Sequence, residues 1–332
     1  MILVTGGTGL VGGHLLLHLL KNDSKTQIRA TYRSVEKIQL TKDLFEKSDQ
    51  ADVFENIEWV QADLLDITDL EKCFEGITHV YHAAAMISFK PKDYTLMRKT
   101  NIEGTANMVN FSIDGGIRKF CFVSSIAAVE ENPFGEMTGE DEEWNAERSK
   151  NGYAISKYGA EMEVWRGSQE GLDVVIVNPG VILGPGYWNQ GSGKLFRSVA
   201  KGLKYYTTGI TGFVGVWDVV RGMQLLMDSN IKNERYIFVS ENLSYQVVLE
   251  SMAKALGVKA PSKEAGKFLM GLAWRMDWIR FKFTGRGPRM TKFTAASAIS
   301  KSYYSSKKIE SSVLDFEFEP IASVLSRTVR LK

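Results

Sequence analysis

Residues 1–12, with the sequence MILVTGGTGLVG, decide the fold of this chain. A short apolar run leads into a turn with three glycines, and the helix-forming sequence HLLLHLL follows. A strand, a glycine turn and a helix in this order let a pyrophosphate approach the backbone amides at the helix N-terminus. The alternative is a strand-to-helix turn that binds no ligand. We expect a dinucleotide to contact Gly6, Thr8, Gly9, Leu10, Val11 and Gly12.

The N-terminal half alternates apolar, strand-like runs with helical segments. Further strands are expected at 27–33, 57–63, 78–85 and 118–125. This alternation predicts an α/β fold with a doubly wound parallel sheet of the Rossmann type. We expect residues 1–180 to form the domain that binds the cofactor and carries the catalytic residues. Residues 181–332 are expected to form mainly a smaller substrate-binding lobe, with segments at about 213–240 returning to the sheet.

The composition is that of a globular protein and narrows the possible partners. The chain has 332 residues, of which 44% are hydrophobic and 24% charged, and its net charge is +2. Such a small charge does not favour nucleic acid as a partner. Cys73 and Cys121 are far apart, so we expect a reducing cytoplasm and no disulfide framework. With an apolar strand starting at the first residue and no run of roughly 20 apolar residues, neither a signal peptide nor a membrane span is expected.

No metal site is expected either. All four histidines lie within the first 82 residues, without the spacing or partners of a zinc site or of a Ser-His-Asp triad. His14 and His18 fall on the helix after the glycine turn, and His82 falls in an expected strand. We expect these histidines to pack or cap rather than to catalyse.

The end of the second expected strand bears on the choice of dinucleotide. NAD enzymes usually carry an acidic residue there that binds the ribose hydroxyls, whereas an arginine nearby accommodates the 2′-phosphate of NADP. This chain has Arg33 at that point and Lys37 a turn later, with no carboxylate at the strand end. NADP is therefore the preferred cofactor. NAD is the alternative, in which case Arg33 is a solvated charge or stacks on the adenine of either cofactor.

The next two expected strands end in residues that suit the same cofactor. Asp63, followed by Leu64, would place a carboxylate near the adenine amine. Ala83, Ala84 and Ala85 are small enough for backbone to lie against a cofactor. We therefore expect these five residues to line the cofactor site.

Three residues later in the chain carry acid-base chemistry. Ser125 ends an expected strand at the carboxyl edge of the sheet, where open α/β sheets bind ligands. Tyr153 and Lys157 are four residues apart in an expected helix and so share one face. A fixed ammonium beside a phenol lowers the phenol pKa from its usual value near 10. Such pairs are common in helices, and it is the order of glycine turn, strand-end serine and Tyr-Lys pair that indicates a catalytic site.

These motifs resemble the extended short-chain dehydrogenase/reductase family over about the first 220 residues. The family's TGxxGxxG corresponds to Thr5–Gly12, its strand-end serine to Ser125 and its YxxxK to Tyr153 and Lys157. Dihydroflavonol 4-reductase-like and 3β-hydroxysteroid dehydrogenase-like members are the most similar. Two departures from the family pattern bear on the substrate. Glu130 stands where plant enzymes carry an Asn that binds flavonoid, which disfavours a flavonoid substrate. Ile126-Ala127 replaces the acidic pair of dehydratases, which disfavours sugar dehydration.

The resemblance implies further site residues and a mechanism. Asn101 would complete a catalytic tetrad and support a water relay, and Pro179 and Gly180 would lie beside the cofactor. Tyr153 would exchange a proton with the substrate oxygen during hydride transfer, while Lys157 would hold the nicotinamide ribose. A homodimer is also implied. The same residues serve an NADP-dependent reductase, its reverse reaction or an NAD-dependent nucleotide-sugar epimerase, and a non-catalytic dinucleotide-binding regulator is a further alternative.

The C-terminal part should supply the contacts that choose the small-molecule substrate. Residues 267–292 are unusually aromatic and basic, which indicates a helix lining an apolar pocket or, alternatively, a helix in peripheral contact with a membrane. Both interpretations favour a lipophilic ketone or alcohol over a free sugar. A nucleotide sugar would need basic partners for its diphosphate, for which Lys194, Arg197 and Arg221 are candidates unless they are solvated charges.

Overall fold

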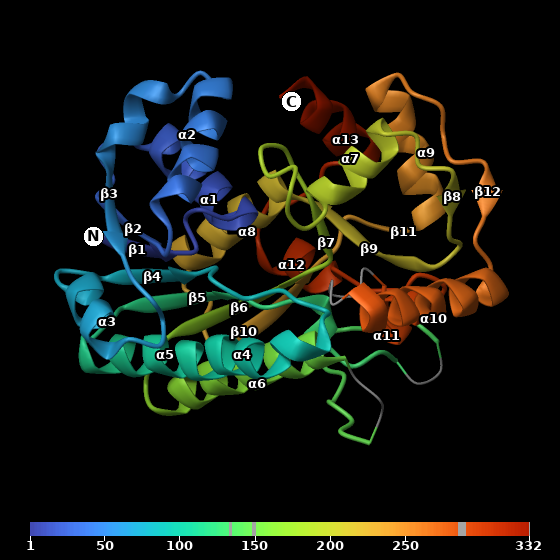
Figure 1. Cartoon of the computed structure of the whole chain (residues 1–332). Coiled ribbons are helices and arrows are strands. Elements are labelled where there is room, and N and C mark those ends of the chain that lie inside the picture. Colours follow the sequence, from blue (N-terminus) through green and yellow to red (C-terminus); the bar gives the residue numbers. More distant parts are fainter. Residues whose placement is uncertain (133–134, 148–150, 285–289, 332) are drawn as a thin grey trace.

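The computed structural model describes residues 1–132, 135–147, 151–284 and 290–331. Its centre is a sheet of seven parallel strands in the order β10-β6-β5-β4-β1-β2-β3 (Figure 1). The strands are β1 (Ile2–Thr5), β2 (Ile28–Tyr32), β3 (Ile57–Gln61), β4 (His79–His82), β5 (Lys119–Val123), β6 (Val174–Pro179) and β10 (Glu234–Phe238). The chain reverses direction across the sheet between β1 and β4, and open α/β sheets bind ligands at such a switch point. The predicted α/β fold with a doubly wound parallel sheet is confirmed.

Helices cover both faces of this sheet (Figure 1). One face carries α1 (Leu10–Asn22), α2 (Ile38–Lys47) and α8 (Val216–Asp228). The opposite face carries α3 (Ile67–Phe74), α4 (Tyr94–Arg98), α5 (Gly104–Asp114) and α6 (Gly152–Gln169). Short turns of helix interrupt the connections at Val35–Lys37, Ala51–Asn56, Pro91–Asp93, Lys99–Glu103 and Ile126–Ala128.

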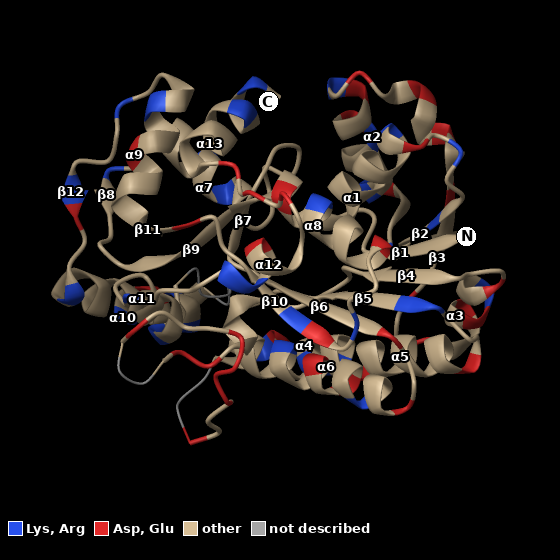
Figure 2. Ribbon diagram, turned by 180° about the vertical axis from the view of Figure 1, so that it is seen from behind, with Lys and Arg blue, Asp and Glu red and all other residues tan. Residues whose placement is uncertain are grey.

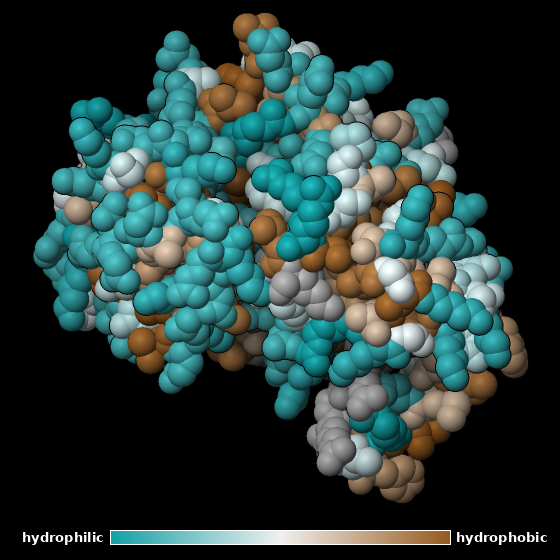
Figure 3. Space-filling model, turned by 90° about the horizontal axis from the view of Figure 1, so that it is seen from above, coloured by the Kyte–Doolittle hydropathy of each residue, from teal (hydrophilic) through white to brown (hydrophobic). Residues whose placement is uncertain are grey.

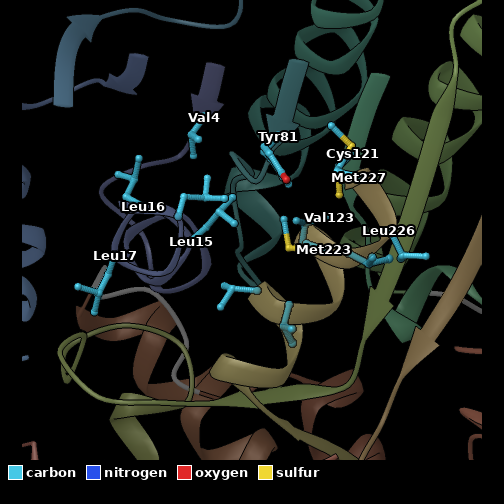
Figure 4. Packing of buried hydrophobic residues seen from close by; sticks show 14 of the residues in the cluster. Val4, Leu15, Leu16, Leu17, Tyr81, Cys121, Val123, Met223, Leu226 and Met227 are labelled. Carbon is cyan, nitrogen blue, oxygen red and sulfur yellow. The ribbon is translucent and has the colours of Figure 1, made fainter. Parts of the chain in front are cut away.

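Two cores form because successive strand residues point to opposite faces. In β1, Val4 packs with Leu15 and Leu16 of α1, whereas Leu3 lies in the core on the other face of the sheet. Figure 4 shows the first core, where Met223 of α8 and the side chains of α1 approach the middle strands from the same face. Burial on both faces explains why the strands read as continuous apolar runs.

A second, smaller sheet and its helices form the C-terminal part (Figure 1). Its strands are β7 (Val181–Leu183), β9 (Ile210–Gly215) and β11 (Glu241–Ser244), and β8 (Tyr205–Tyr206) pairs with β12 (Lys263–Glu264). The helices are α7 (Gly193–Ala200), α9 (Tyr245–Leu256), α10 (Lys267–Thr284), α11 (Lys292–Ser297), α12 (Lys307–Ser312) and α13 (Ile321–Arg330). A third core joins Phe196, Phe213, Met252 and Val324 of this part.

The segment 213–240 divides between the two sheets. Residues 213–215 belong to β9 and therefore to the smaller sheet. Helix α8 then packs against α1, and β10 pairs in parallel with β6 at the edge of the main sheet. Among the described residues, no helix is long and apolar enough to cross a membrane.

Candidate active site

Short backbone contacts close the glycine turn between β1 and α1. Gly6 has a positive φ of 73°, a conformation that favours glycine, and its carbonyl accepts the amide of Gly9 at 2.9 Å. A Cβ on Gly12 would collide with the same carbonyl. Gly9 is the N-cap of α1, supplies no side-chain cap, and is followed by no acidic residue in the first turn. The amides at this helix N-terminus are therefore available to an anion.

Adding one methyl group to this glycine turn should weaken its binding of the dinucleotide. We expect Gly12→Ala to weaken binding of NADPH by at least about tenfold, or about 1.4 kcal/mol, because the new Cβ displaces the Gly6 carbonyl. Titration of the purified protein by NADPH fluorescence measures the effect. Gly139→Ala is the matched control, since its Cβ meets no heavy atom within 4 Å. Equal affinity in the Gly12 variant and the wild type would contradict the assignment of the turn.

A groove beside the turn collects most of the residues predicted to bind the dinucleotide. It is lined by Gly6, Thr8, Gly9, Arg33, Lys37, Asp63, Leu64, Ala83, Ala84 and Ala85. These residues follow β1, β2, β3 and β4, and they meet because parallel strands end at the same edge of the sheet. Leu10, Val11 and Gly12 lie in the first turn of α1.

Five lining residues were not among the predicted contacts: Thr31, Tyr32, Ala62, Thr100 and Gln190. Four of them adjoin a predicted residue in the sequence, so an extension of each motif by one or two positions would have found them. Gln190 lies between β7 and α7, far from any motif, and no sequence signal pointed to it.

The donors in this groove fit a dinucleotide that carries phosphates. The open N-terminus of α1 suits a pyrophosphate, and Arg33 and Lys37 bring positive charge to the side of the groove after β2. Asp63 is held in place, because its carboxylate accepts the amide of Leu65 at 3.0 Å. The backbone of the glycine turn lies close to the backbone after β4, since a Cβ on Gly6 would lie 2.8 Å from the amide nitrogen of Ala84.

Ser125 and Tyr153 lie close together at the start of α6. The Ser125 side chain is near enough to the Tyr153 hydroxyl to favour the phenolate, and Ser125 Oγ accepts the amide of Ala127 at 3.1 Å. Burial raises the pKa of Tyr153 above its usual value, and the neighbouring Ser125 only partly offsets this. The ring of Phe89 lies against Tyr153, edge to face at 5.9 Å between centroids. The phenol is therefore protonated at neutral pH.

Lys157 is engaged elsewhere than expected. Its Nζ donates to the carbonyl of Val123 at 2.7 Å and lies 4.3 Å from the ring centre of Phe122. Burial lowers the pKa of Lys157 to about 7, opposed by the charge of Glu161. In this arrangement the Lys157 ammonium is directed to the end of β5, and the causes of the pKa shift of Tyr153 are burial and Ser125. A lowering of the pKa of Tyr153 by Lys157 therefore stays a prediction.

Asn101 holds two elements together. It lies in the π-helical turn Lys99–Glu103, where its Oδ1 accepts the amide of Met86 at 2.7 Å. Its Nδ2 donates to the carbonyl of Met86 and to Ser156 Oγ, both at 3.0 Å. Asn101 therefore joins the segment after β4 to α6 and acts as a positioning residue for both.

A buried carboxylate that the sequence reasoning missed lies one turn beyond Lys157. Glu161 has no exposed surface, and its oxygens accept Ser124 Oγ at 2.7 Å and Asn178 Nδ2 at 2.9 Å. Arg235 of β10 reaches the same carboxylate at 3.1 Å. The ribbon in Figure 2 marks charged positions on both α6 and β10. The four-residue spacing from Lys157 was the available sequence signal.

Pro179 and Gly180 occupy the junction of the two sheets instead of the groove. The Gly180 amide donates to the Phe238 carbonyl at 3.0 Å, and a Cβ on Gly180 would collide with the carbonyl of Gly212. The described residues that line the groove do not include either. The predicted cofactor contacts of these two residues thus have no counterpart in the groove, because β6 continues into β7 at this point.

His82 is a structural residue, as expected. Its ring lies in the sheet with no exposed surface and bonds to Thr5 Oγ1 at 2.6 Å and Thr105 Oγ1 at 3.1 Å. Burial lowers the pKa of His82 to about 3, so the imidazole is neutral at neutral pH. Among the described residues, no group of three His, Cys, Asp or Glu side chains could hold a metal ion.

Two cavities adjoin the Ser-Tyr pair. The larger, of about 640 Å³, is bounded on one side by the residues after Ser125 and by Ala154. The smaller, of about 270 Å³, is mainly apolar and includes Phe89, the ring that contacts Tyr153. Phe293 of α11 lines both.

The basic residues considered for a diphosphate do not line these cavities. Among the described residues that line the larger cavity, Lys292 is the basic one. Glu130 and Glu131 line the same cavity and carry the opposite charge. Arg221 instead pairs with Asp218 at 2.9 Å. Arg286 and Arg289 of the basic aromatic segment lie outside the described residues.

The fold and the site together define a class. A doubly wound sheet, an open glycine turn and a tyrosine next to a strand-end serine are the parts of an NAD(P)-dependent enzyme that acts on CH–OH or C=O groups.

Comparison with known proteins gives the family. A family model described as male sterility protein matches residues 4–211. A putative dihydroflavonol 4-reductase of Synechocystis sp. is 30% identical over 317 residues, which are 92% of this chain and 87% of that protein. Sterol demethylase protein B of Methylococcus capsulatus is 29% identical over 86% of this chain and 83% of its own. The chain belongs to the extended short-chain dehydrogenase/reductase family.

The fold recurs in solved structures of epimerases. UDP-glucose 4-epimerase from Thermotoga maritima, solved with UDP-glucose, superposes with a TM-score of 0.77 over 99% of this chain and 97% of its own. The two sequences are 20% identical, so this likeness establishes the fold alone.

Proposed function

We propose that this protein is an NADP-dependent reductase of a lipophilic ketone or aldehyde, or acts in the reverse direction on the alcohol. The observation that carries the proposal is the Ser125–Tyr153 pair, which adjoins the cavities at the carboxyl edge of the sheet. When bound, the dinucleotide supplies or accepts the hydride.

Tyr153 supplies the proton of this reaction. Its raised pKa keeps the phenol protonated at neutral pH, which is the form that donates a proton to a carbonyl oxygen as the carbon is reduced. Ser125 orients the same oxygen by a hydrogen bond. In the oxidative direction the phenolate form of Tyr153 accepts the proton of the alcohol.

The surroundings of the pair support an apolar substrate. The smaller cavity is walled by Phe89, Tyr94, Met97, Ile155 and Phe293 among others. Two of the relatives are named for dihydroflavonol and sterol chemistry, which involves fused or aromatic rings. Lys292 alone among the described residues of the larger cavity would meet a diphosphate, so a nucleotide sugar fits less well.

A substrate screen tests the proposal. We expect consumption of NADPH with an apolar ketone or aldehyde and none with UDP-glucose. Interconversion of UDP-glucose and UDP-galactose with bound NAD and no net cofactor loss would instead identify an epimerase. Cofactor binding without turnover of any carbonyl compound, alcohol or UDP-sugar would favour a regulator.

The side chain of Arg33 should decide between the two cofactors. We expect Arg33→Glu to weaken NADPH binding by at least about tenfold, because a hydrogen bond to a charged group contributes about 1.5–3 kcal/mol, and to leave NADH binding unchanged or tighter. Separate titrations with the two cofactors measure this. Lys25→Glu is the control, an exposed cation before β2 that does not line the groove. Equal losses for both cofactors would contradict recognition of a 2′-phosphate.

A further inference from the structure

Helices α10 and α11 expose more apolar surface than a helix packed on a protein core. On α10 only Met270 is buried. Phe268 and Phe283 are each 87% exposed. In the view from above, apolar side chains are visible among polar ones on the side of the molecule that holds the C-terminal part (Figure 3). The exposed large apolar residues of the two helices, called here the α10–α11 patch, are Phe268, Leu269, Leu272, Met276, Trp278, Ile279, Phe283 and Phe293.

Cations are interleaved with these apolar side chains. Exposed basic residues of the two helices are Lys267, Arg275, Lys282 and Lys292. The Lys282 ammonium lies 4.4 Å from the ring centre of Trp278. The one acidic residue in the described part of these helices, Asp277, binds Arg280 at 2.9 Å and the amide of Met290 at 2.9 Å. The patch therefore presents aromatic side chains and excess positive charge together.

The patch is continuous with the substrate cavities. Helix α11 packs against α10. Lys292, Phe293, Ala296 and Ser297 of α11 line the larger cavity, and Phe293 also lines the apolar one. The same short helix therefore separates the exposed patch from the site of reaction.

We propose that this patch docks on the surface of an anionic lipid bilayer and that the lipophilic substrate passes from the bilayer to the cavities beside α11. Aromatic side chains flanked by lysine and arginine are the composition that binds the interface between headgroups and acyl chains. The second part rests on the proposed function, whereas docking itself does not.

Charge favours a bilayer over a second copy of the chain as the occupant. In a two-fold dimer through this patch, each copy would place its own lysines and arginines against those of its partner. Like charges at an interface are unfavourable, whereas phosphate headgroups neutralise them.

Flotation of the full chain with vesicles tests docking. We expect binding to vesicles that contain phosphatidylglycerol, weaker binding to phosphatidylcholine alone, and loss of binding at high salt. The double variant Phe268→Ser, Phe283→Ser should no longer float. Leu314→Ser is the matched control, because Leu314 is 90% exposed and lies outside the patch. Lys282→Gln should weaken partitioning by about fivefold, the contribution of one basic residue near an anionic surface, and Lys21→Gln on α1 should not.

The outcomes separate docking from catalysis. Flotation lost only in the patch variants supports the inference. Absence of flotation, or equal flotation in patch and control variants, overturns it, as does a wild-type dimer that the patch variants dissociate without any lipid binding. Reduction of a water-soluble ketone by NADPH tests the proposed function separately: turnover without flotation refutes docking alone, and flotation without turnover of any carbonyl compound refutes the reductase alone.

Discussion

Replacing Tyr153 with phenylalanine is expected to reduce kcat for the carbonyl substrate by about 10²–10⁴-fold, the usual contribution of a positioned acid or base. The variant keeps the ring that packs against Phe89 and loses only the hydroxyl beside Ser125. Steady-state rates of NADPH oxidation measure the loss. The Kd for NADPH should change little, because the cofactor groove is left intact.

A second tyrosine on the same helix provides the control for this variant. Tyr158 stacks on Trp144 at 4.2 Å between centroids, away from Ser125. Tyr158→Phe should therefore retain the wild-type kcat. If Tyr153→Phe were as active as Tyr158→Phe, the proton would have to come from another group and the proposed mechanism would be wrong.

Removal of the Glu161 carboxylate should give the largest loss of stability. We expect Glu161→Ala to lower the free energy of unfolding by about 3–5 kcal/mol, the usual cost of breaking a buried ion pair from one side. The variant leaves Arg235 without its carboxylate partner, and Ser124 and Asn178 without an acceptor. Urea denaturation followed by circular dichroism measures the change.

Two further variants show whether burial of the carboxylate causes the loss of stability in Glu161→Ala. Glu163 on the same helix pairs with Arg166 at 2.9 Å but is 28% exposed, so Glu163→Ala should cost less than about 1 kcal/mol. Glu161→Gln keeps the shape and one acceptor oxygen, and its loss should fall between the two. Equal stability of the two alanine variants would contradict the role assigned to this network.

The cofactor groove could be predicted because each of its parts is local in the sequence. Gly6, Arg33, Asp63 and Ala84 each follow a recognisable strand, and a parallel sheet places all such strand ends at one edge. The motif and its position after a strand therefore suffice. Gln190 shows the limit, since it reaches the groove on a loop that no local pattern identifies.

The interior of the catalytic region could not be predicted in the same way. The helical spacing places Lys157 on the face of Tyr153, but the carbonyl of Val123 that binds its ammonium depends on how α6 packs against β5. Glu161 and Arg235 are 74 residues apart, and they meet only because β10 pairs with β6. Contacts of this kind depend on the order of strands, which the sequence pattern does not specify.

The position of β10 has a consequence for synthesis on the ribosome. This strand is the last of its sheet to be translated, and it supplies both the edge pairing of β6 and the guanidinium that neutralises Glu161. A nascent chain that has not yet reached β10 exposes β6 as an unpaired apolar edge, which favours association with other chains. Completion of the cofactor-binding half must therefore wait until much of the other half has emerged.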